Sequence, residues 1–214
     1  MKAAPSRSAP VAKSRRVFFP LLLAVLLAVL FWKCFLPGFV QFSNDGPLGQ
    51  QVAAWAKLPA GLTGIWGDLN DIGSSGGSFT LDLDTLFRWL VGSVGYSKFL
   101  APFAMFILGL GAWSFFRQLK LSPLAVVLGG LAAGLQTTWF SNACWGVASQ
   151  QIAVGMTYFA LALVVSNTPE TPGLVRWTRM ALAGLAVGMN VMEGADNGAI
   201  FSVFIAAFIL VRAL

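Results

Sequence analysis

The chain has 214 residues, of which 57% are hydrophobic and 10% are charged, and its mean hydropathy is +0.76. These values exclude an ordinary soluble domain, because so much apolar surface cannot be buried in one core surrounded by water. The formal net charge of +6 does not indicate nucleic-acid binding, since the basic residues are scattered along the chain rather than gathered with aromatic residues on one surface. The composition indicates an integral membrane protein.

The chain opens with a basic tail and a first apolar run. Residues 1–16 are rich in Ala, Ser, Pro and Arg and are predicted to be disordered. The sequence Phe31-Trp32-Lys33 follows the apolar run where a signal peptide would have a small-residue cleavage site, so the run is interpreted as an uncleaved signal anchor.

Six apolar runs approach the length of about 20 residues that a membrane-spanning helix needs. We place them at 17–36, 99–116, 122–140, 150–166, 177–192 and 198–214. The predicted fold is therefore all-α: a polytopic transmembrane helix bundle over residues 17–214.

The basic residues predict the orientation of this bundle, because Lys and Arg in short loops are retained on the cytoplasmic side. With a cytoplasmic N-terminus, the basic residues between and after the later spans are also cytoplasmic: Arg117, Lys120, Arg176, Arg179 and Arg212. Every acid except Glu170 then lies at or beyond the outer surface. The predicted topology has both termini inside the cell.

The first outer segment, about 37–98, is too long for a simple connection. Its stretch "QQVAAWAKL" has Val52, Trp55 and Leu58 at helical spacing, which predicts an amphipathic helix on the membrane surface. The following "GIWGDLNDIGSSGGSF" is typical of a loop, and we expect residues 73–78 to be its most mobile part. The stretch "LDLDTLFRWLVGSV" predicts a second interfacial helix.

Four acids of this segment have two interpretations. Asp82 and Asp84 flank a predicted helix start, where negative charge complements the helix dipole. Asp68 and Asp71 lie in the glycine-rich loop as either solvated turn residues or binding groups.

Glu193 and Asp196 lie in "NVMEGADNGAI", between two apolar runs that are both short for a full crossing. Both acids are therefore expected slightly below the outer surface. Ionised carboxylates in apolar surroundings are costly, so such residues usually line a wet cavity, pair with a cation or take part in chemistry. A tight polar hairpin between helices is the alternative.

The polar stretch "WFSNACWGVASQQ" joins two predicted spans on the same outer side. Asn142, Trp145, Gln150 and Gln151 would supply hydrogen bonds and a stacking face, as sugar-binding sites do. Equally, Trp139 and Trp145 would be ordinary aromatic residues of the membrane interface.

The chain has no histidine and only two cysteines, Cys34 and Cys144. This composition excludes a zinc site of the usual His and Cys type, while an oxygen-ligated divalent ion stays compatible with the acids. The cysteines fall near the outer ends of their spans, where they would either form a disulfide or simply pack.

Three polar groups thus follow predicted spans on the outer side, the first being Asp45 in the turn "FSNDGPLGQ". This arrangement resembles the GT-C superfamily of polytopic glycosyltransferases. Several stretches from about residue 17 to the end are similar to the N-terminal part of bacterial YfhO-like membrane proteins: "SNDGPLGQ", "WGDLNDIG", "GAWSFFRQLKLSPLAVVLGGLAAGL", "SNACWGVASQQIA" and "MEGADNGAIFS".

The resemblance implies transfer of a sugar from a polyprenyl-phosphate donor to a glycan, polymer or lipid acceptor at the outer face of the bacterial inner membrane. It implies that Asp45 acts as, or positions, the catalytic base, and that Glu193 and Asp196 orient acceptor or donor or hold a metal. A carboxylate can take the proton of an acceptor hydroxyl as that hydroxyl attacks the anomeric carbon. The donor phosphate is expected to contact basic residues of the outer segment: Lys57, Arg88 and Lys98.

The resemblance also implies further spans beyond "FILVRAL", so the chain is expected to be a fragment or truncated product of such a protein. Two other functions are kept open: a transporter, because intramembrane acids beside broken helices also build substrate pathways, and a non-catalytic membrane assembly subunit. The sequence shows no internal repeat that would favour the transporter. It does not specify the sugar, the acceptor, a metal requirement or the oligomeric state.

Overall fold

The computed structural model of the protein describes residues 11–63, 66–67, 74–75 and 79–213. Most of these residues are helical, and the strands are a two-residue antiparallel pair in which Trp66 lies opposite Ser75. The elements follow one another as α1 (Val11–Leu30), a 3-10 turn η1 (Trp32–Phe35), α2 (Leu48–Ala56), η2 (Ala60–Leu62), β1 (Trp66–Gly67), β2 (Ser74–Ser75), α3 (Leu83–Gln118), α4 (Pro123–Gly134), α5 (Thr137–Trp145), α6 (Ser149–Val165), α7 (Gly173–Glu193) and α8 (Ala195–Ala213).

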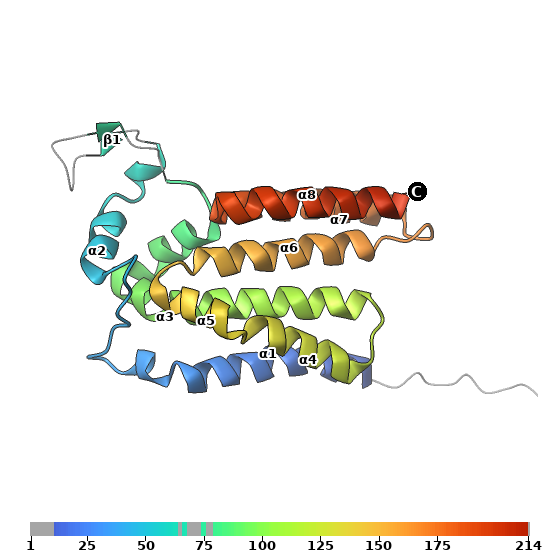
Figure 1. Ribbon diagram of the computed structural model, residues 1–214, viewed down its shortest axis with the longest axis horizontal. Helices are drawn as coiled ribbons and strands as arrows, with labels where there is room; N and C mark the ends of the chain where they lie inside the picture. Colours follow the sequence, from blue (N-terminus) through green and yellow to red (C-terminus); the bar gives the residue numbers. More distant parts are fainter. Residues whose placement is uncertain (1–10, 64–65, 68–73, 76–78, 214) are drawn as a thin grey trace, which may run out of the picture.

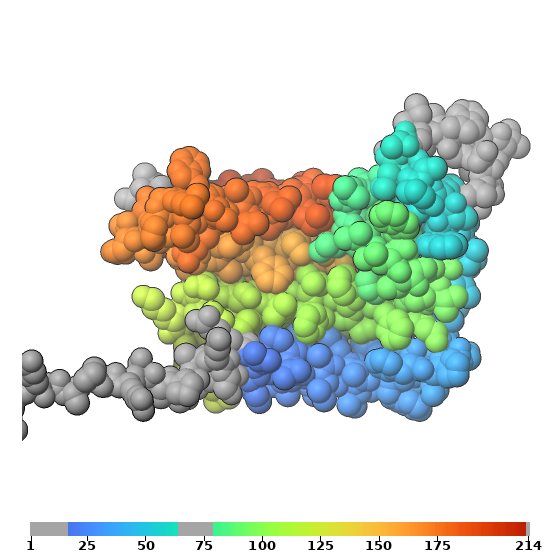
Figure 2. Space-filling view, turned by 180° about the vertical axis from the view of Figure 1, so that it is seen from behind, coloured from blue at the N-terminus to red at the C-terminus, as the bar shows by residue number. Residues whose placement is uncertain are grey.

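The long helices run side by side, while α2 and the strand pair lie at one end of the bundle (Figure 1). Figure 2 shows the same layers from behind, with α1 along one edge, α3 in the middle and α7 and α8 along the other edge. The predicted helical bundle is confirmed.

Three helical stretches are long and apolar enough to cross a membrane: Leu83–Gln118, Pro123–Trp145, which takes α4 and α5 together, and Ala195–Arg212. The apolar parts of α1 and α6, Val17–Leu30 and Ser149–Val165, are shorter. Helix α7 has 21 residues but carries two arginines, Arg176 and Arg179, in its first two turns. Six crossings therefore remain a prediction.

Three boundaries differ from the sequence-based expectation. Helix α1 begins at Val11, inside the stretch expected to be disordered, while residues 1–10 lie outside the described part. Its regular helix ends at Leu30 and the 3-10 turn η1 follows, so the apolar run to residue 36 is not one helix. The run 122–140 is divided between α4 and α5, because the backbone leaves the helical conformation at Leu135 and Gln136.

The core forms around α3, which packs against α1, α4 and α6. Phe19 of α1 stacks on Trp113 of α3 with ring centroids 5.3 Å apart. Glycines allow the helix backbones to touch: a Cβ built on Gly111 would lie 2.5 Å from the carbonyl oxygen of Gly155 in α6. Small residues at such contacts are typical of helices that associate within a membrane.

Helix α3 has 36 residues, which at about 1.5 Å per residue is much longer than a hydrocarbon core of about 30 Å. It is kinked at Gly92, whose φ of 73° and ψ of 173° are not helical. The kink separates an N-terminal part, residues 83–91, which we call the α3 arm, from the long helix in the bundle. The predicted interfacial helix and the predicted span 99–116 are thus two parts of one kinked element.

Candidate functional site

The described acids other than Glu170 lie at one end of the bundle (Figure 1). Figure 1 places α2, the α3 arm, the α5–α6 junction and the α7–α8 junction at the end opposite the C-terminus. This polar end carries the described acids Asp45, Asp82, Asp84, Glu193 and Asp196. At the other end, Arg212 Nη2 donates to the carbonyl of Asn167, and Arg179 Nη1 donates to that of Ser166. Most acids are thus gathered at one end of the bundle, together with Lys57 and Arg88 of the first outer segment.

The turn that carries Asp45 is fixed to the end of α5. The backbone N–H of Asp45 and the hydroxyl of Ser43 both donate to the carbonyl of Trp145, at 3.1 and 3.0 Å. The hydroxyl of Ser43 also accepts from the N–H of Gly46 at 3.1 Å. The carboxylate of Asp45 is exposed and accepts from Asn44 Nδ2 at 3.0 Å. The backbone is held while the carboxylate faces solvent.

Gly146 makes this attachment possible. It ends α5 with a φ of 116°, in the left-handed region that favours glycine. A Cβ there would collide with the Ser43 hydroxyl and would lie 3.0 Å from the Gly46 nitrogen. The two turns that the sequence suggested as site elements therefore meet directly.

Helix α2 continues the site from the Asp45 turn to the α3 arm. Its Gln51 is 7% exposed, and a Cβ on Gly46 would lie 2.5 Å from Gln51 Nε2. Gln51 lines two neighbouring cavities. The smaller cavity lies against the Asp45 turn and Tyr96. The larger, of about 240 Å³, is lined by Gln50, Gln51, Ala54, Lys57, Phe79 and Arg88.

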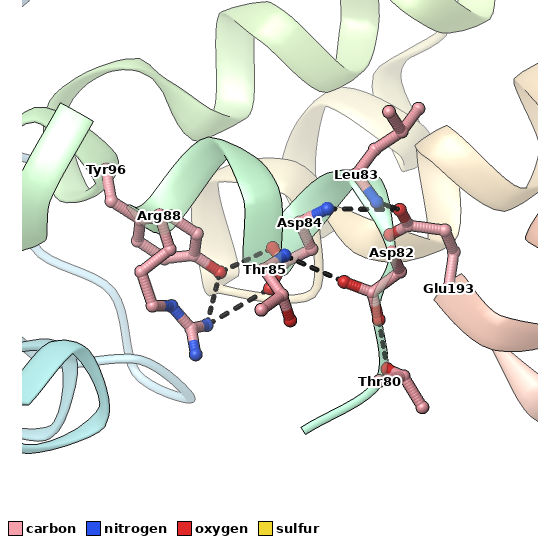
Figure 3. Close-up of polar contacts among 8 residues, drawn as sticks. All are labelled: Thr80, Asp82, Leu83, Asp84, Thr85, Arg88, Tyr96 and Glu193. Carbon is pink, nitrogen blue, oxygen red and sulfur yellow. Dashed lines mark hydrogen bonds and ion pairs between the residues drawn. The ribbon is translucent and has the colours of Figure 1, made fainter. Parts of the chain in front are cut away.

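Arg88, Asp84 and Tyr96 form a closed hydrogen-bonded network on α3 (Figure 3). Arg88 Nη2 donates to Asp84 Oδ2 at 3.1 Å and to the Tyr96 hydroxyl at 2.8 Å, and that hydroxyl donates to Asp84 Oδ1 at 2.6 Å. The guanidinium carbon also lies 4.4 Å from the centroid of the Tyr96 ring. The network bridges the kink at Gly92, because Asp84 and Arg88 precede it and Tyr96 follows it.

Two carboxyl groups cap the N-terminus of α3. Asp82 Oδ1 accepts from the N–H of Thr85 at 2.7 Å, which confirms its predicted role at a helix start. Glu193 reaches the same turn from α7: its Oε1 accepts from the N–H of Leu83 at 2.6 Å and from that of Asp84 at 3.1 Å (Figure 3). The first N–H groups of a helix have no partner within the helix, so these carboxyls satisfy them.

Glu193 is in an unfavourable place for a negative charge. Burial and the neighbouring carboxyls of Asp82 and Asp84 raise the pKa of Glu193 to about 8, against the opposing effect of its two backbone donors. Its Oε2 has no hydrogen-bond partner in the described part of the chain. Glu193 is thus buried between α7 and the start of α3, while its depth relative to a membrane stays a prediction.

The other predicted site residues lie apart from this network. Asp196 is exposed on the first turn of α8, and Lys98 Nζ donates to the carbonyl of Leu36 at 2.7 Å. Asn142 and Gln150 are half-buried, and the Trp145 side chain is 55% exposed. The smaller cavity is lined at this point by Ala143, Cys144 and Gly146. Asn142 and Trp145 are not among its lining residues. Gln151 is buried and donates to the carbonyl of Trp139.

Asp68, Asp71 and most of 73–78 lie outside the described residues.

The described residues contain no group of three or more His, Cys, Asp or Glu side chains arranged to hold a metal ion. Glu193 points toward α3 and Asp196 toward solvent, so neither is assigned as a metal ligand. Cys34 and Cys144 are free thiols.

Sequence reasoning missed two members of the site, Gln51 and Tyr96, and treated Asp84 only as a helix-start acid. The four-residue spacing of Asp84 and Arg88 was a usable signal, because such pairs are neighbours on a helix. Tyr96 had no comparable signal, since its contact depends on the kink at Gly92.

The comparisons with known proteins found no match: no family model, no curated protein and no solved structure resembles the chain significantly.

Proposed function

We propose that the chain is a multi-pass membrane protein that transfers a sugar from a polyprenyl-phosphate donor to a cell-envelope acceptor at the outer face of a bacterial inner membrane. The observation that carries the proposal is the cavity of about 240 Å³ that Lys57 and Arg88 line together at the polar end. These are two of the three basic residues expected to contact the donor phosphate. They come from different elements, the segment after α2 and the α3 arm.

The chemistry of this cavity suits a phosphate group. Arg88 Nε is buried without a hydrogen-bond partner in the described part of the chain, although Nη2 is occupied by Asp84 and Tyr96. A guanidinium with an unused N–H and a nearby ammonium favour a phosphate through charge-assisted hydrogen bonds. Gln50 and Gln51 add amide donors at the same cavity.

A lipid-linked donor needs a site at the boundary between water and hydrocarbon. Both α2 and the α3 arm expose apolar side chains while they bury Gln51 and Thr85. The exposed set comprises Leu48, Val52 and Trp55 of α2 and Leu86, Trp89, Leu90 and Val91 of the arm. Such amphipathic helices are suited to the membrane surface, so we place the polar end at the outer surface and the basic end in the cytoplasm, with six helical crossings.

In this proposal Asp45 is the general base. Its turn is fixed to α5 and contacts Gln51, which also lines the phosphate cavity. An acceptor hydroxyl beside Asp45 would give up its proton as it attacks the anomeric carbon, and the phosphate would leave toward Lys57 and Arg88. Glu193 acts indirectly, by holding the start of the arm that carries Arg88.

The test is transfer of radiolabelled sugar from polyprenyl-phosphate donors in membranes that contain the chain. We expect transfer by the wild type and a loss for Lys57→Gln. The matched control is Lys120→Gln, an exposed lysine in the loop between α3 and α4 at the opposite end. Solute flux in liposomes without transfer would instead support a transporter, and absence of both would support an assembly subunit.

A further inference from the structure

Two side chains near the end of α7 are buried and have polar atoms without a hydrogen-bond partner in the described part of the chain. Asn190 is 0% exposed and Glu193 is 6% exposed. Both amide atoms of Asn190 and Oε2 of Glu193 have no partner in the described part of the chain. The residues are three positions apart on one helix, so their side chains lie on the same face. Buried polar atoms of this kind usually have a partner, because removing them from water without a new hydrogen bond destabilises the protein.

Acidic groups outnumber basic groups around Glu193. The titratable and charged groups nearby belong to α3 and α8: Asp82, Asp84, Arg88, Tyr96 and the exposed Asp196. The adjoining start of α6, around Gln150, is uncharged. The one basic group in this set, the guanidinium of Arg88, pairs with Asp84 rather than with Glu193.

We propose that Glu193 and Asn190 form a buried proton-binding site whose occupancy controls how the α3 arm docks on α7. The ligand is a proton taken from water, carried on Glu193 Oε2 while Oε1 continues to accept from the arm. A carboxamide is a suitable neighbour for both states: its oxygen accepts from a protonated carboxyl, and its NH₂ donates to a carboxylate.

Opposing effects decide whether the proton is held. The two N–H donors and the positive end of the helix dipole favour the carboxylate. Burial and the carboxyls of Asp82 and Asp84 disfavour the carboxylate more strongly. Together they raise the pKa of Glu193 to about 8. The site is therefore mainly occupied at neutral pH.

The arm joins the rest of α3 at a glycine, and the hydrogen bonds of Asp84 and Arg88 to Tyr96 also hold it there. Gly92 forms a kink whose surroundings are open, since a Cβ there would meet nothing within 4 Å. When the arm is released, Glu193 is exposed to water and has its ordinary pKa of 4.5. Because the docked pKa is the higher one, docking is most stable below about pH 4.5 and loses stability as the pH rises through about 8.

The composition of the chain allows a direct test, since it contains only two glutamates, Glu170 and Glu193. Protein labelled with ¹³C at the glutamate δ carbon gives two side-chain carboxyl signals in nanodiscs, and Glu170→Gln leaves that of Glu193 alone. The exposed Glu170 has a lowered pKa through hydrogen bonds at Thr168 and its own backbone, so its signal titrates in acid. We expect the Glu193 signal to titrate near pH 8, and titration below about pH 5 would overturn the proposal.

Coupling to the arm is tested by hydrogen exchange in peptides that cover residues 83–91. Glu193→Gln keeps an oxygen acceptor but cannot titrate. The ratio of exchange rates, wild type over Glu193→Gln, should rise several-fold between pH 6 and pH 9. Asp196→Asn, which removes an exposed acid three residues away, should follow the wild type. A ratio that does not change with pH would overturn the coupling, while the carboxyl titration of the wild type would still test the proton site itself.

Discussion

The middle of the bundle and its polar end are held together by different contacts. In the middle, backbones touch at glycines: a Cβ on Gly134 would lie 2.9 Å from the Cα of Gly109, and Gly111 lies against Gly155. At the polar end, side chains bind backbone groups of distant segments, as Glu193 does at the start of α3. The first kind of contact depends on shape and the second on hydrogen bonding.

The two regions also differ in how completely their polar atoms are paired. Among the described residues, partnerless buried side-chain atoms at the polar end belong to Gln51, Arg88, Gln151, Asn190 and Glu193. At the opposite end, both amide atoms of Asn167 are buried without a partner in the described part of the chain. Two of these residues, Gln51 and Arg88, line the cavity of about 240 Å³, and unpaired groups around a cavity are what a ligand site offers.

The largest expected effect is on the network at the polar end. Arg88→Met leaves the Asp84 carboxylate, whose side chain is 15% exposed, without its ion-pair partner. We expect the free energy of unfolding to fall by about 3–5 kcal/mol. Equilibrium unfolding in mixed detergent micelles, followed by circular dichroism, measures it. The double variant Asp84→Leu/Arg88→Met should lose much less than the sum of the single losses, and full additivity would show that the pair is not coupled.

A smaller effect is expected at the glycine contacts. Gly111→Ala forces the α3 and α6 backbones apart and should lower the free energy of unfolding by about 1–3 kcal/mol. The matched control is Gly184→Ala in α7, where an added Cβ meets nothing within 4 Å. That variant should be neutral or slightly stabilised, because alanine favours helix more than glycine. Equal melting temperatures for the two variants would contradict the close packing of α3 on α6.

The smallest effect concerns the attachment of the Asp45 turn. Ser43→Ala removes one hydrogen bond to the carbonyl of Trp145 and one from the N–H of Gly46. Each contributes about 0.5–1.5 kcal/mol, and partial exposure reduces the loss. Protection of the Asp45 amide in hydrogen exchange should fall, whereas Ser202→Ala, which removes a hydrogen bond within α8, should leave it unchanged. Unaltered protection in Ser43→Ala would show that the hydroxyl does not hold the turn.

Local sequence patterns predicted the helices, the capping by Asp82 and the gathering of most acids at one end, because each depends on neighbouring residues or on the composition of the loops. They did not predict that Glu193 caps α3, since the partners are 109 and 110 residues apart. The kink at Gly92 was also hidden, because a glycine in an apolar helix pattern is compatible with a straight helix. Long-range hydrogen bonds and a single backbone torsion thus determined what the sequence left open.

The central claim is that chemistry occurs at the polar end, with Asp45 as the base. Its most direct test is the initial rate of sugar transfer from a radiolabelled polyprenyl-phosphate donor by the wild type, Asp45→Asn and Glu170→Gln. Asp45→Asn keeps the shape and an oxygen acceptor, and it should lower the rate about 10²–10⁴-fold. Glu170→Gln, an exposed change at the opposite end, should leave the rate unchanged. Wild-type turnover by Asp45→Asn would contradict the account and leave Asp45 as a turn residue at the end of the bundle.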